Sequence, residues 1–167
     1  MERRIISPWQ WQDGFGYVQA NEVRGAQRIL YCSGQAANDE TGAAVYAGDM
    51  RAQITLALDN LETLLHQAGF TFADIMRLNI YTTDVDQFFA NYDAIIGRLA
   101  EAGCQHTGSL IGVARLAFPE MMVEIEATVA CSRSSTSQEV ELDRRFTDEK
   151  NYSGGSELWA CGICCFS

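Results

Sequence analysis

The chain has 167 residues, of which 47% are hydrophobic and 20% are charged, a composition typical of one globular domain with its own core. The formal net charge of −10 would repel a phosphate backbone, so the sequence argues against nucleic-acid binding and favours small-molecule partners. No apolar run approaches the roughly 20 residues that cross a bilayer, and the first residues do not resemble a signal peptide. We therefore expect no membrane association and a cytoplasmic location.

The first half of the chain predicts strands followed by a helix. Apolar residues recur at steps of three and four over residues 49–68, which predicts a helix with one apolar stripe. Asp49 can cap its start, and Gly69 can adopt the left-handed conformation that ends it. The strands that precede it are expected at residues 3–7, 17–23 and 27–32.

The second half repeats this alternation of strand and helix. A second apolar stripe predicts a helix over residues 85–102, between a capping Asp84 and a terminating Gly103. Apolar and polar residues alternate before and after this helix, with the period of a strand. These strands are expected at residues 76–81, 109–114 and 122–131.

This order of elements predicts an α+β fold, in which two helices cover one face of a mostly antiparallel six-stranded sheet. Two helices shield only one side of such a sheet, so its other face needs a different cover. A closed cyclic oligomer would provide it, and subunit contacts would create clefts for a small ligand.

The periodic pattern stops near Cys131, and a serine-rich stretch follows it. We place a domain at residues 1–131 and expect residues 132–167 to form a flexible polar tail, because they carry too few apolar side chains to bury a face. The tail ends in a cysteine-rich segment with Cys161, Cys164 and Cys165. One C-x-x-C pair is half of a zinc site and no histidine lies nearby, so we expect no metal.

Two carboxylates stand out in the last predicted strand. Glu124 and Glu126 are two residues apart, so they share one face of the sheet and lie about 7 Å from each other. Either one can exchange a proton with water in a cleft. The alternative is a solvated strand face, or an ion pair with Arg77 or Arg115.

Three further residues can contact a ligand. Tyr17 can present its hydroxyl, although tyrosines beside strands often pack with that group in water. Ser33 and Gly34 follow an apolar strand and can expose backbone N–H groups to an anion, or form an ordinary bend.

Five segments stand out by their order and spacing: Phe15-Gly16-Tyr17-Val18, Cys32-Ser33-Gly34-Gln35, Asp59-Asn60-Leu61 and, near the end of the domain, Val113-Ala114-Arg115-Leu116 and Glu124-Ile125-Glu126-Ala127. Taken together, they resemble the RidA/YjgF family over residues 5–131. That resemblance implies a chorismate-mutase-like fold and a homotrimer whose clefts between subunits bind small carboxylates. It also implies hydrolysis of reactive enamines or imines to ketoacids and ammonia, without a metal or organic cofactor.

The resemblance assigns roles to four of these residues. Glu124 matches the glutamate that activates water, and Tyr17, Ser33 and Gly34 match groups that orient the substrate. The arginine that clamps the carboxylate has no counterpart, because the family's Pro-Ala-Arg-Ser segment falls on His106-Thr107-Gly108-Ser109. Gly108 therefore stands at the position of the arginine, beside Ser109.

Two further positions of the family have alternatives in this chain. A ligand-contacting asparagine of the family falls either on Asn91 or, in a second alignment, on Phe89. In place of the missing arginine, His106 can serve in part as a hydrogen-bond donor.

The sequence supports two functional hypotheses. The first is a metabolite-binding trimer that hydrolyses an imine-type C–N bond. The second is a non-catalytic member that senses a ligand or binds another protein.

Overall fold

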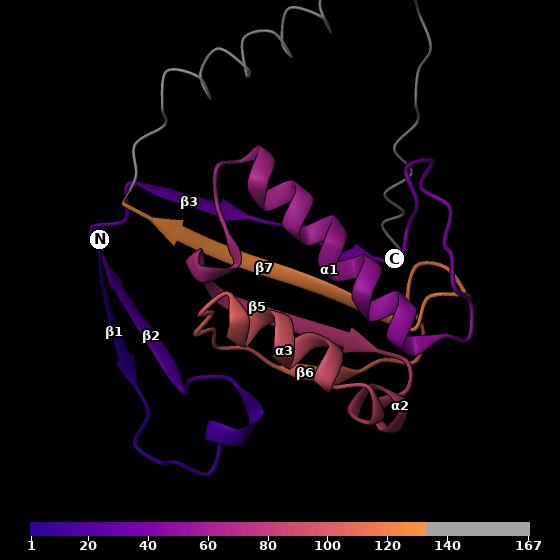
Figure 1. Cartoon of the computed structure of the whole chain (residues 1–167), viewed down its shortest axis with the longest axis horizontal. Coiled ribbons are helices and arrows are strands. Elements are labelled where there is room, and N and C mark those ends of the chain that lie inside the picture. Colours follow the sequence, from indigo (N-terminus) through magenta and orange to yellow (C-terminus); the bar gives the residue numbers. More distant parts are fainter. Residues whose placement is uncertain (133–167) are drawn as a thin grey trace, which may run out of the picture. The chain divides into compact units, whose positions relative to one another are not determined.

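The structure, a computed structural model, describes residues 1–132, and its element order is close to the predicted one (Figure 1). The α+β class is confirmed. The strands are β1 (Glu2–Ile6), β2 (Ala20–Arg24), β3 (Arg28–Tyr31), β4 (Gln35–Ala36), β5 (Ile75–Thr82), β6 (Leu110–Gly112) and β7 (Val123–Cys131). The helices are α1 (Met50–Gln67), α2 (Val85–Ala90) and α3 (Asp93–Glu101), with short 3-10 turns at Asp13–Phe15 and Phe72–Asp74.

The main sheet has five strands in the order β3-β7-β5-β6, with β4 also paired to β7. The long strands β5 and β7 are antiparallel and form its centre, whereas β5 and the edge strand β6 are parallel. Alternate residues of β5 and β7 point to opposite faces, so Ile80 and Ile125 enter the core while Tyr81 and Glu124 lie on the other side.

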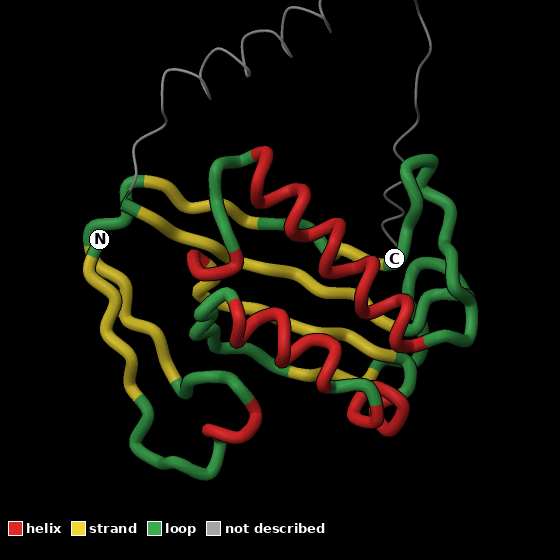
Figure 2. Tube along the Cα trace, viewed as in Figure 1, coloured by secondary structure: helices red, strands yellow, loops and turns green. Residues whose placement is uncertain are grey.

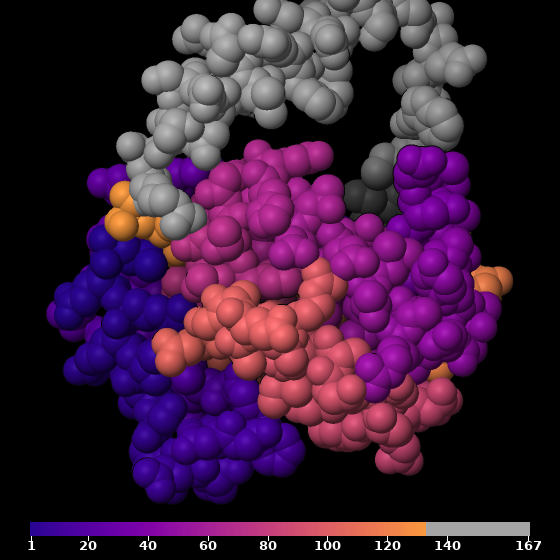
Figure 3. Space-filling model, viewed as in Figure 1, coloured from indigo at the N-terminus to yellow at the C-terminus, as the bar shows by residue number. Residues whose placement is uncertain are grey.

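Helices α1 and α3 cover one face of this sheet, and the other face has no helix within residues 1–132 (Figure 2). The stripe of α1 is buried completely and includes Ile54, Leu58, Leu61 and Leu65. Each such side chain stabilises the fold by about 1.5–3 kcal/mol. In the space-filling view, atoms of α1 and α3 close over the sheet on this side (Figure 3).

The predicted ends of the first helix are confirmed. The Asp49 carboxylate accepts a hydrogen bond from the Ala52 N–H at 3.0 Å, which caps the start of α1. Gly69 has a φ of 71°, in the left-handed region, and the Phe70 N–H reaches back to the Leu65 carbonyl at 2.8 Å.

The single helix predicted over residues 85–102 is wrong in one respect, because it is divided into α2 and α3. Asn91 interrupts it: its side-chain amide donates to the Gln87 carbonyl at 2.9 Å, and its own backbone N–H turns to the Phe88 carbonyl. This competition between a side chain and the backbone is typical of asparagine inside helices.

The prediction of one six-stranded sheet also needs correction, because β1 and β2 form a separate two-stranded sheet. Side chains join this hairpin to the body where a backbone ladder was expected. The Asn21 amide donates to the carbonyls of Met76 and Gln105, at 3.0 and 2.9 Å. The Met76 carbonyl also accepts the Thr107 N–H at 3.0 Å, so the Asn21 amide bonds to a group that already takes part in the backbone pairing of the body.

From residue 133 on, the proposed tail lies outside the described residues, as do its cysteines Cys161, Cys164 and Cys165. Among residues 1–132, no helix combines the length and the hydropathy of a membrane span.

Candidate functional site

Within one chain, the residues predicted to form the site fall into two groups. Tyr17, Gly108 and Ser109, here called the edge group, line two adjoining cavities at the β6 edge of the sheet. Gly34 and Glu124 meet on the face that carries no helix, and Ser33 precedes Gly34 in the chain; these three residues are called the face group.

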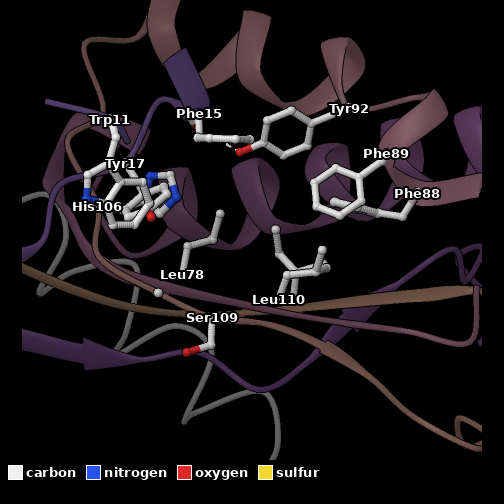
Figure 4. A pocket seen from close by; sticks show the side chains of 12 residues that line it. Trp11, Phe15, Tyr17, Leu78, Phe88, Phe89, Tyr92, His106, Ser109 and Leu110 are labelled. Carbon is white, nitrogen blue, oxygen red and sulfur yellow. Dashed lines mark hydrogen bonds between the residues drawn. The ribbon is translucent and has the colours of Figure 1, made fainter. Parts of the chain in front are cut away.

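The first cavity, called the aromatic cavity, has a volume of about 300 Å³. Figure 4 shows the rings of Phe15, Phe89 and Tyr92 on one side and the apolar side chains of Leu78 and Leu110 on the other. The rings contact one another edge to face or tilted, as aromatic pairs prefer. Its aromatic lining comprises Trp11, Phe15, Tyr17, Phe88, Phe89 and Tyr92.

Local structure brings these rings together from distant segments. The Tyr92 hydroxyl donates to the Phe15 carbonyl at 2.6 Å, which ties the break between α2 and α3 to the loop before β2. Burial, followed by the proximity of Tyr17, raises the pKa of Tyr92, so this hydroxyl stays protonated near neutral pH. The break that divides the predicted helix thus shapes the cavity.

The polar groups beside the aromatic cavity are uncharged near neutral pH. His106 is 7% exposed, and burial, aided by Arg3, lowers its pKa to about 4. Its Nδ1 lies 3.7 Å from the Sγ of Cys104, whose pKa burial raises to about 11. A neutral imidazole cannot replace a guanidinium as a cationic clamp, although it remains able to form a hydrogen bond.

The second cavity, called the polar cavity, has a volume of about 460 Å³ and adjoins the first. Among the described residues that line the two cavities, Arg77 is the only one that carries a charge near neutral pH. The Arg77 Nε donates to the Asn79 Oδ1 at 3.1 Å. The polar cavity is lined by the edge group, Arg77, Thr107 and residues 18–21.

Gly108 has no room for a side chain. The Leu78 N–H donates to the Thr107 carbonyl at 2.8 Å, and the Ile80 N–H donates to the Ser109 carbonyl at 2.9 Å, which holds this segment against β5. A Cβ atom on Gly108 would overlap the Leu78 carbonyl oxygen. The space next to Gly108 in that direction is therefore filled by backbone, and an arginine there would require the segment to move.

The face group is built around a close contact between Glu124 and Gly34. Glu124 lies opposite Ala36 of β4 and Tyr81 of β5, and its carboxylate lies against the Gly34 backbone. The Gln35 side chain donates to the carbonyls of Ser33 and Gly34, at 3.1 and 3.3 Å, which braces the bend.

Glu126, the second carboxylate of the strand, is engaged in a hydrogen-bond network. Its Oε1 accepts from the Asn79 amide at 2.6 Å and from the Tyr81 hydroxyl at 3.0 Å. The hydrogen bond to Glu126, more than burial, raises the pKa of Tyr81. Arg77 reaches Glu126 through Asn79, so the alternative of a structural role fits Glu126 better than it fits Glu124.

Phe89 lines the aromatic cavity, whereas the Asn91 side chain bonds to its own helix. Sequence reasoning named Arg77 only as a possible ion-pair partner of the two glutamates, and it missed most of the aromatic side chains that line the aromatic cavity. The concentration of aromatic residues at positions 9–17 and 88–92 was a usable signal, but the pairing of Arg77 with Thr107 requires the register of the strands.

The two groups do not meet within one chain. Glu124 lies on β7, and β5 separates that strand from the segment that carries Ser109, so two strand spacings put their backbones roughly 10 Å apart. Glu124 lines neither the aromatic nor the polar cavity. The described residues also contain no cluster of three or more His, Cys, Asp or Glu side chains able to hold a metal.

Comparison with known proteins gives a consistent result. The family model described as "Endoribonuclease L-PSP" matches residues 14–131. The RutC family protein YjgH of Escherichia coli is 29% identical over 101 residues, covering 60% of this chain and 76% of that protein. The protein mmf2, mitochondrial, of Schizosaccharomyces pombe is 29% identical over 117 residues, covering 70% and 89%.

Solved structures resemble the chain over the same region. YyfB of Yersinia pestis, a Rid family protein of unknown function, is 36% identical with a TM-score of 0.70, covering 78% of this chain and 100% of that one. TdcF of E. coli, solved with bound serine, is 28% identical with a TM-score of 0.57, covering 70% and 88%. The chain therefore belongs to the RidA/YjgF family.

Proposed function

We propose that the protein is a homotrimer that binds a small metabolite in clefts between subunits and hydrolyses an imine or enamine there. The observation that carries this proposal is the division of the site within one chain. The edge group and the face group lie apart in each copy, and a cleft between two copies would join the edge group of one to the face group of the other. The family resemblance implies such a cleft.

Exposed apolar side chains on the open face support the association of subunits. Ile29 and Tyr31 of β3 are 55% and 76% exposed, and they point to the face that carries no helix. Apolar side chains that lack a cover favour contact with a further copy of the chain.

In the proposed reaction, a water oxygen adds to the carbon of the C=N bond while the Glu124 carboxylate accepts the water proton. Glu124 passes this proton to the nitrogen, which gives a carbinolamine with one hydroxyl and one amino group on the same carbon. The hydroxyl proton then moves to the nitrogen as the C–N bond breaks, so that ammonia leaves and the oxygen stays behind as a ketone carbonyl. No electrons are transferred to or from a cofactor. A positioned carboxylate contributes about 10²–10⁴-fold to the rate of such proton transfers.

The comparisons support a small organic ligand over a nucleic acid. TdcF, a relative of known structure, was solved with serine, a molecule that carries a carboxylate and an amino group. The name of the family model mentions an endoribonuclease, but the net charge of −10 opposes binding of an RNA backbone.

The cytoplasm is the location that we propose for the protein.

A second candidate function is ligand sensing without catalysis. Gly108 favours it, because the Leu78 carbonyl fills the space beside it and no guanidinium stands at that position. The two candidates differ in whether the protein hydrolyses its ligand, and therefore in whether Glu124 acts in catalysis.

Ammonia release decides between them. Imines are generated in the assay by an amino-acid oxidase, and the rate is compared for the wild type, Glu124→Gln and Glu101→Gln, a matched change at an exposed site on α3. We expect the wild type and Glu101→Gln to accelerate release equally, and Glu124→Gln to lose about 100-fold or more. No acceleration by the wild type would favour sensing, and full activity of Glu124→Gln would refute the role of Glu124.

A further inference from the structure

The aromatic cavity lies on the helix-covered side of β5. Leu78 and Ile80, which line it, are 1% and 7% exposed and belong to the core face of that strand. Arg77 alternates with them and lies on the open face, where it lines the polar cavity but not the aromatic one. The described residues that line the aromatic cavity include no Asp, Glu, Lys or Arg, and burial keeps His106 uncharged near neutral pH.

The side chains with which the family is expected to hold a polar ligand are missing from this cavity. Gly108 stands at the position of the clamping arginine, and the Leu78 carbonyl fills the space beside it. Phe89, one of the two positions on which the family's asparagine falls, presents a ring to the cavity, whereas the Asn91 amide bonds to the Gln87 carbonyl. A carboxylate placed here would lose its hydration without gaining a cationic partner.

The shape of the lining suits a flat ring. Figure 4 shows Phe15, Phe89 and Tyr92 on one side of the cavity and Leu78 and Leu110 on the other. A ring between these two sides contacts aromatic side chains with one face and aliphatic side chains with the other. The volume of about 300 Å³ lies at the lower end of the range for small-molecule sites. The part of a ligand that enters this cavity is therefore apolar and flat.

His106 gives this apolar cavity a polar group that lacks a partner. It lines the cavity, is 7% exposed, and has its Nδ1 3.7 Å from the Cys104 Sγ. Its Nε2 has no hydrogen-bond partner among residues 1–132. This atom is also not one of the side-chain polar atoms there that are both closed off from solvent and unbonded. The cavity is therefore the place where Nε2 meets a partner.

The contact with Cys104 decides which hydrogen-bonding role is left for Nε2. Burial raises the pKa of Cys104 to about 11, so the thiol keeps its hydrogen near neutral pH. The Cys104 sulfur also accepts the backbone N–H of His106, which directs the thiol hydrogen to Nδ1. The neutral imidazole then carries its own hydrogen on Nε2, so His106 offers a donor to the cavity.

We infer that the aromatic cavity binds an uncharged aromatic ketone or imine, whose ring lies between the two sides of the cavity and whose oxygen or nitrogen accepts a hydrogen bond from the Nε2 of His106. This inference rests on the proposed function, because it names the class of ligand that the edge group receives. The class differs from the carboxylates that the family resemblance implies. The ligand is held by the burial of its ring and by one neutral hydrogen bond.

Equilibrium binding of a matched pair of molecules tests the preference for an uncharged ligand without any turnover. The ketone 2-acetylnaphthalene is uncharged, and 2-naphthoate has nearly the same shape with a carboxylate in place of the acetyl group. By calorimetry we expect the wild type to bind the ketone at least about 10-fold more tightly than the carboxylate. Equal or tighter binding of 2-naphthoate, or no binding of the ketone, would overturn the inference.

Phe89→Ala tests whether the ligand lies in the aromatic cavity. Phe89 is 49% exposed, so its truncation spares the core while it removes one ring of the lining. We expect the affinity for 2-acetylnaphthalene to fall about 10-fold. Phe118→Ala is the matched control, because Phe118 is also 49% exposed and lines neither cavity. An unchanged affinity of Phe89→Ala would place the ligand elsewhere and refute the inference.

Variants of His106 test the hydrogen bond. The reference molecule is 2-ethylnaphthalene, which lacks the oxygen of the ketone. His106→Leu should weaken the binding of 2-acetylnaphthalene about 3- to 10-fold more than that of 2-ethylnaphthalene. His106→Gln, which keeps a side-chain donor, should restore part of the difference. An equal loss for both molecules would show that His106 does not donate to the ligand. Phe89→Ala keeps the inference testable if His106→Leu does not fold.

Failure of this inference is distinguishable from failure of the proposed function. Binding of 2-acetylnaphthalene by a protein that releases no ammonia from imines would refute only the catalytic proposal. Hydrolysis of imines by a protein that binds 2-naphthoate more tightly than the ketone would refute only this inference.

Discussion

The Glu124 carboxylate occupies the space that a side chain at position 34 would need. A Cβ atom on Gly34 would overlap the Oε1 of Glu124, and this oxygen is the end of a flexible side chain. A residue larger than glycine at position 34 would therefore displace the carboxylate without disturbing the backbone.

Gly34→Ala should thus impair function while sparing stability. We expect the rate of imine hydrolysis to fall about 10-fold or more, because the carboxylate leaves its position beside the bend. The free energy of unfolding, measured with urea, should change by less than about 1 kcal/mol. Gly97→Ala is the control, since a Cβ atom there meets nothing within 4 Å. Full activity of Gly34→Ala would show that the contact does not position Glu124.

Gly108→Ala, unlike Gly34→Ala, should destabilise the folded protein. The atom that a Cβ would meet is the Leu78 carbonyl oxygen, which belongs to the central strand and cannot rotate away. We expect the free energy of unfolding to fall by about 1–3 kcal/mol, the usual cost of overpacking. A urea midpoint equal to that of the wild type would show that the segment can move. Gly108→Arg should lower the free energy of unfolding for the same reason.

His106 predicts a pH dependence of stability. Its folded pKa of about 4 lies below the ordinary value of 6.5, so between these values the unfolded chain binds a proton that the folded chain does not. Stability should therefore fall as the pH falls from about 6.5 to about 4, by about 3 kcal/mol from this group. The His106→Gln variant should lack this component of the slope.

Urea denaturation at pH 7 and pH 4 measures that slope, and His66 provides the control because it is exposed on α1. His66→Gln should keep the slope of the wild type. A His106→Gln slope that equals the wild-type slope would show that His106 is not neutral in the folded protein.

Local sequence patterns predicted the elements that depend on local forces. The stripe and both ends of α1 follow from residues close together in the chain, Asp49 at one end and Gly69 at the other. The alternation in β5 and β7 likewise predicted which residues face the core. The position of Glu124 and Glu126 on the same face of the sheet follows from the same alternation.

Contacts between distant segments could not be predicted in this way. The break at Asn91 arises because a side chain competes with the backbone, which periodicity does not register. The pairing of Arg77 with Thr107 depends on the register of a parallel strand pair. The contacts of Gly34 with Glu124 and of Gly108 with Leu78 depend on how the backbone bends. These contacts decide the chemistry of the site.

Mixing two inactive variants tests most directly whether two copies complete one site. Tyr17→Ala damages the edge group and Glu124→Gln damages the face group, and equal amounts are refolded together, with each variant refolded alone as the control. If each site takes one group from each of two subunits, about one quarter of the sites in random trimers are intact, so about one quarter of the wild-type hydrolysis should return. If the mixture is no more active than either variant alone, the site does not form between subunits and the account is wrong.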